Sequence, residues 1–323
     1  AAKVSGNSDQ PQLVICIDVE EDFDWSKPFS REGFGLNSIF ALPTVVRTLR
    51  AFGVTPVLLV DYPVLNDEAA VAVLKSIKAE AVFGTQLHAW VNPPYEEELT
   101  TRNSYAGNLP KELERQKLET LSRLFESVFE QKPKVFRSGR YGFGPNTAEI
   151  LIDLGYEIDL SHFANRDFSF DEGPDFSQVG PNPFTIGDLF CVPVTSGFLG
   201  PLRFMGHRIL AWCDTRIGRG LHFRGALERL GLMGWTWLSP EGVRLRTAMS
   251  LTQALVHQGQ RVFVVSFHSP SLVPGNTSYV KDHKDKNKLE DWVYGFLKFF
   301  KEEMGGAFAT PHQVKETWQK RDS

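Results

Sequence analysis

Clusters of polar residues follow several apolar segments of this chain, and their types could support hydrolytic or metal chemistry. The first cluster is IDVEEDFDW, which carries five carboxylates between Asp18 and Asp24. Carboxylates this close repel one another unless a cation or a basic group lies between them. Because alternate residues of a strand point to the same side, Asp18 and Glu20 are placed together, as a base and a metal ligand would be. A solvated acidic loop is the alternative interpretation.

Three further segments end in residues that could join this chemistry. In FGTQLHAWVNPP, Gln86 and His88 fall on one side of a continuing strand, although a lone histidine can also be hydrogen-bonded scaffolding. In FRSGRYGFGPN, Arg137 and Arg140 bracket a glycine turn, where arginine can orient a carboxylate or bind an anion, or simply belong to a surface turn. In VFVVSFHSPSL, an apolar strand ends in His268, whose imidazole can transfer protons near neutral pH.

Short β-rich segments must position these residues. Seven of them alternate with helical patterns, and they cover residues 13–20, 54–61, 81–88, 134–137, 157–161, 189–194 and 261–268. Most are continuously apolar, which is typical of strands covered on both faces in a parallel sheet. The sequence therefore predicts an α/β fold whose parallel sheet is either open or closed into a barrel. The carboxyl ends of such strands form the ligand face, so the polar clusters should converge there.

The stretch from 197 to 240 interrupts the alternation of strands and helices. It contains a long helical pattern around residues 208–230, and we interpret it as a helical insertion before the last strand. Residues 1–10 are expected to be a disordered leader. Residues 11–321 are expected to form a single domain, because the polar clusters lie as far apart as Asp18 and His268 and must still meet at one rim.

Composition excludes several classes of function. The net charge is -4 and the basic residues are scattered, so we expect no nucleic-acid partner. No apolar run approaches the roughly 20 residues of a transmembrane helix. The start of the chain lacks the features of a signal peptide, so a cytoplasmic protein is expected, with a removed segment left open because the first residue is not Met. The three cysteines are far apart and suggest neither a disulfide framework nor a cysteine zinc site. The oligomeric state is open.

Together the motifs resemble those of the polysaccharide deacetylases, the NodB-homology family of carbohydrate esterases. The resemblance extends from about Leu13 to Trp318: IDVEEDFDW is similar to the first family motif, FRSGRYG to the third and SFHSPSL to the fifth. The short motifs QLH, NPP and HSPSL most resemble those of the WalW-like subgroup. This resemblance implies a distorted parallel (β/α) barrel of about seven strands. It also implies one divalent metal, with zinc the expected ion, at the carboxyl ends of the strands.

The resemblance also implies roles for individual residues. Asp18 would be the catalytic base, Glu20 a metal ligand and His268 the general acid. Arg137 would orient Asp18. The implied activity is a metal-dependent hydrolase, acting on an amide carbon–nitrogen bond, that removes an acetyl or other N-acyl group from a sugar or polysaccharide.

One departure from the family concerns the metal. The second family motif has two metal-binding histidines four residues apart, but Gln86 and Trp90 stand at those positions here and only His88 remains. Glu20 and His88 are two good ligands, one fewer than a catalytic zinc usually has, and Gln86 is a weak candidate for the third. Other candidates are Asp18, Asp22, Asp24 and His162.

Two alternatives follow from that departure. The chain could be a catalytically silent barrel that binds glycan or a partner, or another amide hydrolase on the same fold. For a carbohydrate substrate, we expect contacts from the residues beside the motifs, namely Trp25, Trp90, Tyr141 and Arg140.

Overall fold

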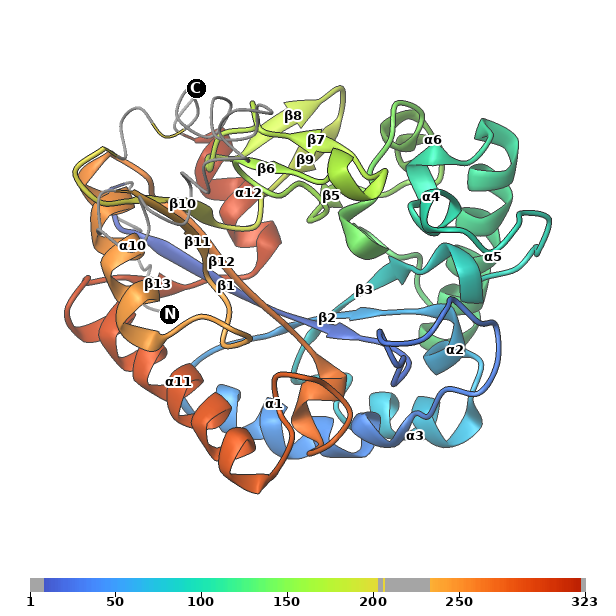
Figure 1. Cartoon of the computed structure of the whole chain (residues 1–323), viewed down its shortest axis with the longest axis horizontal. Helices are drawn as coiled ribbons and strands as arrows, with labels where there is room; N and C mark the ends of the chain where they lie inside the picture. Colours follow the sequence, from blue (N-terminus) through green and yellow to red (C-terminus); the bar gives the residue numbers. More distant parts are fainter. Residues whose placement is uncertain (1–8, 203–205, 207–232, 321–323) are drawn as a thin grey trace, which may run out of the picture.

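The computed structural model describes residues 9–202, 206 and 233–320, in which helices surround a curled nine-stranded sheet (Figure 1). The strands lie in the order β12 (Val262–His268), β1 (Gln12–Val19), β2 (Val57–Val60), β3 (Val82–Leu87), β4 (Val135–Ser138), β5 (Ile158–Asp159), β9 (Leu189–Cys191) and β8 (Phe184–Ile186). A short strand β13 (Ala307–Phe308) also pairs with β1. Neighbouring strands are parallel, except that β8 is antiparallel to β9.

Each of the seven segments expected to be a strand contributes to this sheet. The sheet has two strands more than expected, because β8 and β13 were not anticipated from the sequence. They contain three and two residues respectively, which is too short to produce a periodic pattern of apolar residues.

The barrel is incomplete in the described residues, since the sheet runs from β12 at one end to β8 at the other without closing. The chain beyond β9 partly bridges the gap to β12. Leu238 N donates to Thr195 O at 3.0 Å, and Ser266 N donates to Leu238 O at 3.3 Å. The Thr195 hydroxyl accepts a hydrogen bond from Val264 N at 2.8 Å. Irregular backbone thus completes part of the wall that strand pairing leaves open.

Alternation along the strands divides the side chains between two buried layers. On β1, Leu13, Ile15 and Ile17 face the helices, while Val14 and Cys16 belong to a smaller cluster inside the curl. The inner cluster also receives Val57, Leu59, Val135, Ile158, Leu160, Phe190, Val192, Val262 and Val264. Toward the carboxyl ends of the strands, the residues that point inward are polar, as Asp18, Gln86 and Arg137 are. The inside of the curled sheet is therefore apolar over most of its depth and polar at the edge formed by the strand ends.

Helices form the outer layer of the sheet. They include α1 (Leu42–Ala51), α3 (Glu68–Ser76), α5 (Lys111–Phe129), α6 (Thr147–Asp153), α10 (Leu245–His257), α11 (His283–Glu302) and α12 (Pro311–Gln319). Trp292, Phe296, Phe299 and Phe300 of α11 are buried, and Thr310 and Gln313 form a capping box at the start of α12. Among the described residues, no helix combines the length and apolar character needed to cross a membrane.

The expected helical insertion lies mostly outside the described residues. Its two described ends form an antiparallel hairpin of β10 (Ser196–Leu199) and β11 (Gly234–Trp237) rather than helix. The helix expected around 208–230 and most of the expected leader at 1–10 are not among the described residues. A second hairpin, β6 (Arg166–Asp167) with β7 (Asp175–Phe176), was not anticipated.

Glu114 on α5 is a buried carboxyl group whose ionisation should affect stability. The Thr147 hydroxyl donates to Oε1, but Oε2 has no partner, and burial raises the pKa of Glu114 from 4.5 to about 7. Between these two values the unfolded chain is ionised while the folded chain keeps its proton, so stability falls as pH rises. Above pH 7 the full loss of about 2 to 3 kcal/mol is reached.

Replacing Glu114→Gln should remove this pH dependence. We expect the variant to gain about 2 to 3 kcal/mol relative to wild type between pH 5 and pH 8, measured as free energy of unfolding in urea. Glu112→Gln, an exposed position on the same helix, is the control and should show no such change. An equal difference between variant and wild type at both pH values would contradict the assignment.

Candidate functional site

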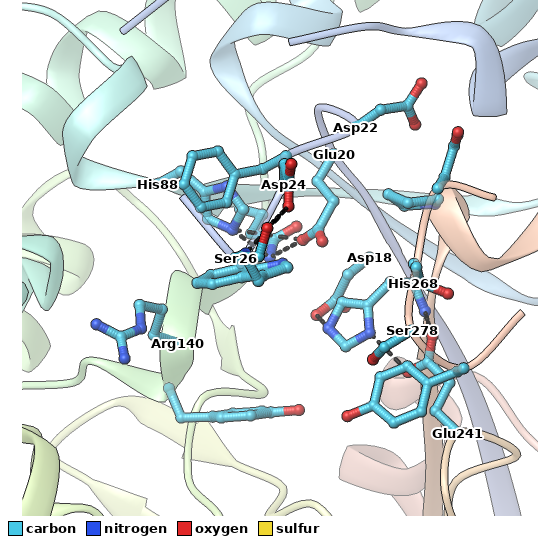
Figure 2. Close-up of a pocket in the computed structure, with 18 of the residues that line it drawn as sticks. Asp18, Glu20, Asp22, Asp24, Ser26, His88, Arg140, Glu241, His268 and Ser278 are labelled. Carbon is cyan, nitrogen blue, oxygen red and sulfur yellow. Dashed lines mark hydrogen bonds and ion pairs between the residues drawn. The ribbon is translucent and has the colours of Figure 1, made fainter. Parts of the chain in front are cut away.

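A cavity of about 900 Å³ lies at the carboxyl ends of the inner strands. The polar residues that continue the inner rows line it: Asp18 on and Glu20 after β1, Gln86 on and His88 after β3, and Arg137 on β4. Figure 2 shows Asp18 between Glu20 and His88 on one side and His268 and Glu241 on the other. Four sequence segments more than 40 residues apart therefore meet at one rim, as the predicted parallel sheet requires.

Asp18 and Arg137 form an ion pair inside the curled sheet. Arg137 Nη1 donates to Asp18 Oδ1 at 2.5 Å and to Ser266 Oγ at 2.5 Å, and Nε donates to Leu160 O at 3.0 Å. Burial opposes the charge of Arg137, but Asp18 and other neighbouring groups together outweigh it and raise the arginine pKa above its usual value. The arginine thus stays charged and holds one carboxylate oxygen of Asp18, while Oδ2 is on the side of His268.

His268 is held between two carboxylates at the end of β12. Its Nδ1 donates to Glu241 Oε2 at 2.7 Å, and its Nε2 lies 3.7 Å from Asp18 Oδ2. Burial disfavours the charged ring, but Glu241 and then Glu20 outweigh this effect and raise the pKa of His268 to about 10. The imidazole is therefore a protonated group whose Nε2 faces Asp18 across the cavity.

Glu20, Gln86 and His88 bring three polar groups together on the other side of Asp18. Gln86 Nε2 lies 3.0 Å from Glu20 Oε2 and 3.1 Å from His88 Nε2, and the latter two atoms are 3.4 Å apart. All three residues are buried at the floor of the cavity. The structure thus brings together the three residues predicted to hold a metal.

His88 is fixed from behind by groups that are fully buried. Its Nδ1 donates to Glu21 Oε2 at 2.8 Å, and Asp61 Oδ2 lies 3.8 Å away. The Trp90 ring stacks on the imidazole with centroids 4.3 Å apart. Burial opposes the charge of His88, but Glu21 and Glu20 together outweigh it and raise the histidine pKa well above its usual value. A carboxylate on Nδ1 leaves Nε2 pointing toward Glu20, which is how histidine ligands are commonly oriented.

These three residues fit a divalent metal in two respects. Nitrogen and oxygen ligands at about 2.0 to 2.2 Å from one ion are roughly 3.0 to 3.5 Å from each other, which matches the three separations. In addition, Gln86 Oε1 is buried without a partner. The two ends of an amide are assigned from hydrogen bonding, and exchanging them would turn this oxygen toward Glu20 and His88.

The other residues considered as ligands have different partners. Asp22 accepts a hydrogen bond from Asn37 N, and the exposed Asp24 pairs with Lys27. His162 bonds to Asp159 beside Cys191, in a second buried group of metal-binding types away from the cavity. Asp18 and Glu20 could also share an ion with His268, because their ligand atoms lie within 4.8 Å of one another.

The predicted substrate-binding residues divide into two groups. Trp25, Tyr141 and Arg140 line the cavity, and Trp25 is 53% exposed at its rim. Arg140 pairs with Asp171 and lies over the Tyr105 ring, so its charge is already partnered. Trp90 does not line the cavity: it is 1% exposed behind His88, where it supports the imidazole rather than offering a surface to a sugar.

Sequence reasoning missed Glu241, which orients His268. It follows the described end of the insertion in WLSPEG, where no strand or regular spacing marks it as functional. Its Oε1 accepts from Ser271 Oγ at 2.5 Å and from His268 N at 3.2 Å. Glu21 and Asp61 behind His88 were also not assigned roles, because contacts between neighbouring strands cannot be read from one sequence.

Solved structures show the same fold. A presumed polysaccharide deacetylase from Mycobacterium smegmatis superposes with a TM-score of 0.56 and 15% identity, over 100% of this chain and 95% of that one. PuuE allantoinase gives 0.52 and 11%, over 98% and 92%. The 4-alpha-glucanotransferase of Thermococcus litoralis gives 0.53 and 11%, over 95% of this chain but 40% of that one. No protein-family model and no curated protein sequence matches the chain. At these identities the likeness establishes the fold, and activity must be argued from the site.

Glu241 should control the protonation of His268. Replacing Glu241→Gln removes the nearest negative charge, so we expect the pKa of His268 to fall from about 10 toward its ordinary value. The measurement is an NMR titration of the histidine rings in chelator-treated protein. Glu303→Gln, an exposed position, is the matched control. A His268 pKa that stays unchanged in Glu241→Gln would refute the role given to this carboxylate.

Gly139 should be required for the position of His88. A Cβ at residue 139 would lie 2.2 Å from His88 Cδ2 and 2.7 Å from Leu87 O, so one of these groups must move. We expect Gly139→Ala to lower the free energy of unfolding by about 1 to 3 kcal/mol and to shift the His88 ring resonances. Gly180→Ala adds its Cβ to open space and is the control. Unshifted His88 resonances in Gly139→Ala would rule out this contact.

Proposed function

We propose that this protein is a hydrolase that cleaves an N-acyl amide bond of a sugar or other acylated carbohydrate. The observation that carries the proposal is the pairing of Asp18 with His268 in the cavity. The Asp18 carboxylate is paired with Arg137, and the His268 imidazole is held protonated by Glu241, with Oδ2 and Nε2 3.7 Å apart. A carboxylate and a protonated imidazole at one rim can serve as the base and the acid that hydrolysis of an amide needs.

The reaction begins with proton transfer from water. Asp18 accepts the proton as the water oxygen adds to the amide carbonyl carbon, and Arg137 keeps the carboxylate oriented for this step. The carbon–nitrogen bond then breaks. His268 Nε2 donates its proton to the departing nitrogen, since an amine leaves readily only when protonated. The products are a carboxylate and a sugar amine.

Glu20, His88 and Gln86 would hold the divalent metal. When bound, such an ion lowers the pKa of a water molecule and polarises the carbonyl oxygen. The chain contributes the orientation of the ligands, because Glu21 and Trp90 fix the His88 ring. Zinc is the expected ion, and the amide oxygen of Gln86 also suits harder ions such as Mn²⁺.

The cavity walls favour a carbohydrate with an amine product. Trp25, Phe170 and Tyr279 are large exposed aromatic side chains that line the cavity, and such rings can stack on sugar faces. Several carboxylates, including Asp22, Asp24 and Asp171, also line it. A negative wall repels phosphate backbones and attracts a protonated amine.

A second candidate function is a catalytically silent barrel that binds glycan or a partner. The observation that favours it is the hydrogen bonding of Gln86, whose Nε2 faces both Glu20 and His88 and so links the two ligands without an ion. A third candidate is hydrolysis of a different amide, since PuuE allantoinase shares the fold. Both alternatives predict measurable differences from the first.

The test combines metal analysis with substitutions at the acid and the base. We expect protein reconstituted with Zn²⁺, Co²⁺ or Mn²⁺ to retain about one ion per chain and to release amine from chito-oligosaccharides. Asp18→Asn and His268→Ala should each lower kcat by about 100-fold or more. Asp291→Asn and His283→Ala, both exposed on α11, are the matched controls.

Each outcome discriminates between the candidates. Failure to retain any ion, together with glycan binding but no hydrolysis, would establish the silent barrel. Hydrolysis of allantoin or peptide amides in preference to chito-oligosaccharides would establish another amide hydrolase. Activity that survives both substitutions unchanged would show that the proposed acid and base are wrong.

A further inference from the structure

A second, smaller cavity adjoins the first beside His268. It has a volume of about 240 Å³, and we call it the annex. Its aromatic walls come from Tyr141, Phe163, Phe168, Trp235, Trp237 and Tyr279. The rings pack on one another: Trp235 and Trp237 have centroids 5.1 Å apart, and Phe163 lies 5.8 Å from Trp235. The β10–β11 hairpin supplies the two tryptophans, so the annex is built by the segment that bridges the open side of the sheet.

The annex and the large cavity share the residues of the proposed acid. Tyr141, Glu241 and His268 line both spaces, as do Phe168 and Tyr279. A ligand in the annex therefore lies next to His268, whose Nε2 is 3.7 Å from Asp18. The two spaces meet at the point where we place the scissile amide.

The carboxylate and serine oxygens of the annex form hydrogen bonds within the protein, whereas the buried Nε1 of Trp235 has no partner among the described residues. Both oxygens of Glu241 accept hydrogen bonds, from His268 and Ser271. Ser266 Oγ accepts from Arg137 Nη1, and Ser239 Oγ accepts from Glu241 N. The Arg166 guanidinium lies over the Trp235 ring, 4.6 Å from its centroid. Six aromatic side chains form much of the remaining wall and offer few partners for the hydroxyl groups of a sugar, so this space suits an apolar occupant better than a second sugar ring.

We propose that the annex binds the acyl group of the substrate and selects apolar acyl groups much larger than acetyl. This inference rests on the proposed amide hydrolysis. An amide has two substituents, and the two cavities that meet at His268 also differ: one is large and lined by several carboxylates, and the other is small and lined largely by aromatic rings. The sugar amine occupies the large cavity and the acyl chain the annex.

The volume of the annex sets the size of that group. At roughly 30 Å³ for each water-sized group, 240 Å³ holds about eight non-hydrogen atoms. An octanoyl chain or a phenylacetyl group matches this size, whereas the methyl group of acetyl leaves most of the annex unfilled. In the reaction, water adds to the carbonyl carbon and the carbon–nitrogen bond breaks. The acyl group leaves as a carboxylate and the sugar as an amine that takes its proton from His268.

The test is a series of glucosamines that carry N-acetyl, N-butanoyl, N-octanoyl and N-phenylacetyl groups. We expect wild-type kcat/KM, measured as amine release, to be at least about tenfold higher for octanoyl and phenylacetyl than for acetyl. Trp235→Ala should reduce this octanoyl-to-acetyl ratio by about tenfold. Val194→Phe, which adds a ring to the annex wall, should reduce it as well. Phe170→Ala, at the rim of the large cavity only, is the matched control and should leave the ratio unchanged.

The outcomes separate this inference from the proposed function. Hydrolysis of acetyl as fast as octanoyl would overturn the acyl assignment while the proposed hydrolase stands. If no compound is hydrolysed, the proposed function fails, and calorimetric binding to wild type and Trp235→Ala decides the annex alone. Octanoyl-glucosamine that binds at least about tenfold tighter than acetyl-glucosamine, with the difference lost in Trp235→Ala, would support the site, and equal binding would reject it.

Discussion

The buried ion pair between Asp18 and Arg137 is the interaction on which the rest of the site depends. It crosses the interior of the curled sheet, where Arg137 on β4 reaches Asp18 on β1, Ser266 on β12 and a carbonyl that follows β5. In the described part of the chain, neither Asp18 nor Arg137 has a second oppositely charged group within hydrogen-bond distance. Removing one member of such a buried pair typically destabilises a protein by about 3 to 5 kcal/mol. The pair also fixes which oxygen of Asp18 is left for chemistry. Because Oδ1 is bound to Arg137, Oδ2 is the oxygen that faces His268. Oδ2 is therefore the oxygen that would accept a proton in the proposed reaction.

The two histidines on either side of Asp18 are oriented in the same way as each other. A buried carboxylate holds Nδ1 of each ring, Glu241 for His268 and Glu21 for His88, and leaves Nε2 directed into the site. The surroundings of Nε2 then separate their roles. His268 is about one-third exposed and faces a single base, which suits a proton donor. His88 is enclosed by Trp90 and Gly139 and faces Glu20 and Gln86, which suits a ligand whose position must not change.

Sequence patterns were sufficient for the strands and for the residues that continue them. Seven apolar segments predicted the main strands, and period-2 alternation placed Asp18 with Glu20 and Gln86 with His88, because the inner face of a parallel sheet leaves little choice of direction. The sequence could not supply groups that act across the fold. Glu241 reaches His268 from an irregular segment. Trp90 was expected to contact a carbohydrate but is buried in a loop whose backbone is bound by Lys117 from α5. Lys117 on α5 binds the carbonyls of Ala89, Asn92 and Pro94 and so holds this loop inward.

The orientation of the Gln86 side-chain amide determines whether its oxygen can serve as a ligand of the proposed metal. In one orientation, the amide nitrogen of Gln86 donates to Glu20 and His88 and the amide oxygen has no partner. In the reversed orientation, the oxygen faces Glu20 and His88 and could bind an ion beside them, and the nitrogen is then the end without a partner. Without the ion the buried Oε1 is unsatisfied, and such an atom destabilises a protein by about 1 to 3 kcal/mol. An ion held in the proposed site by the oxygen of Gln86 would remove that destabilisation, and it would displace the two hydrogen bonds that the amide makes to Glu20 and His88.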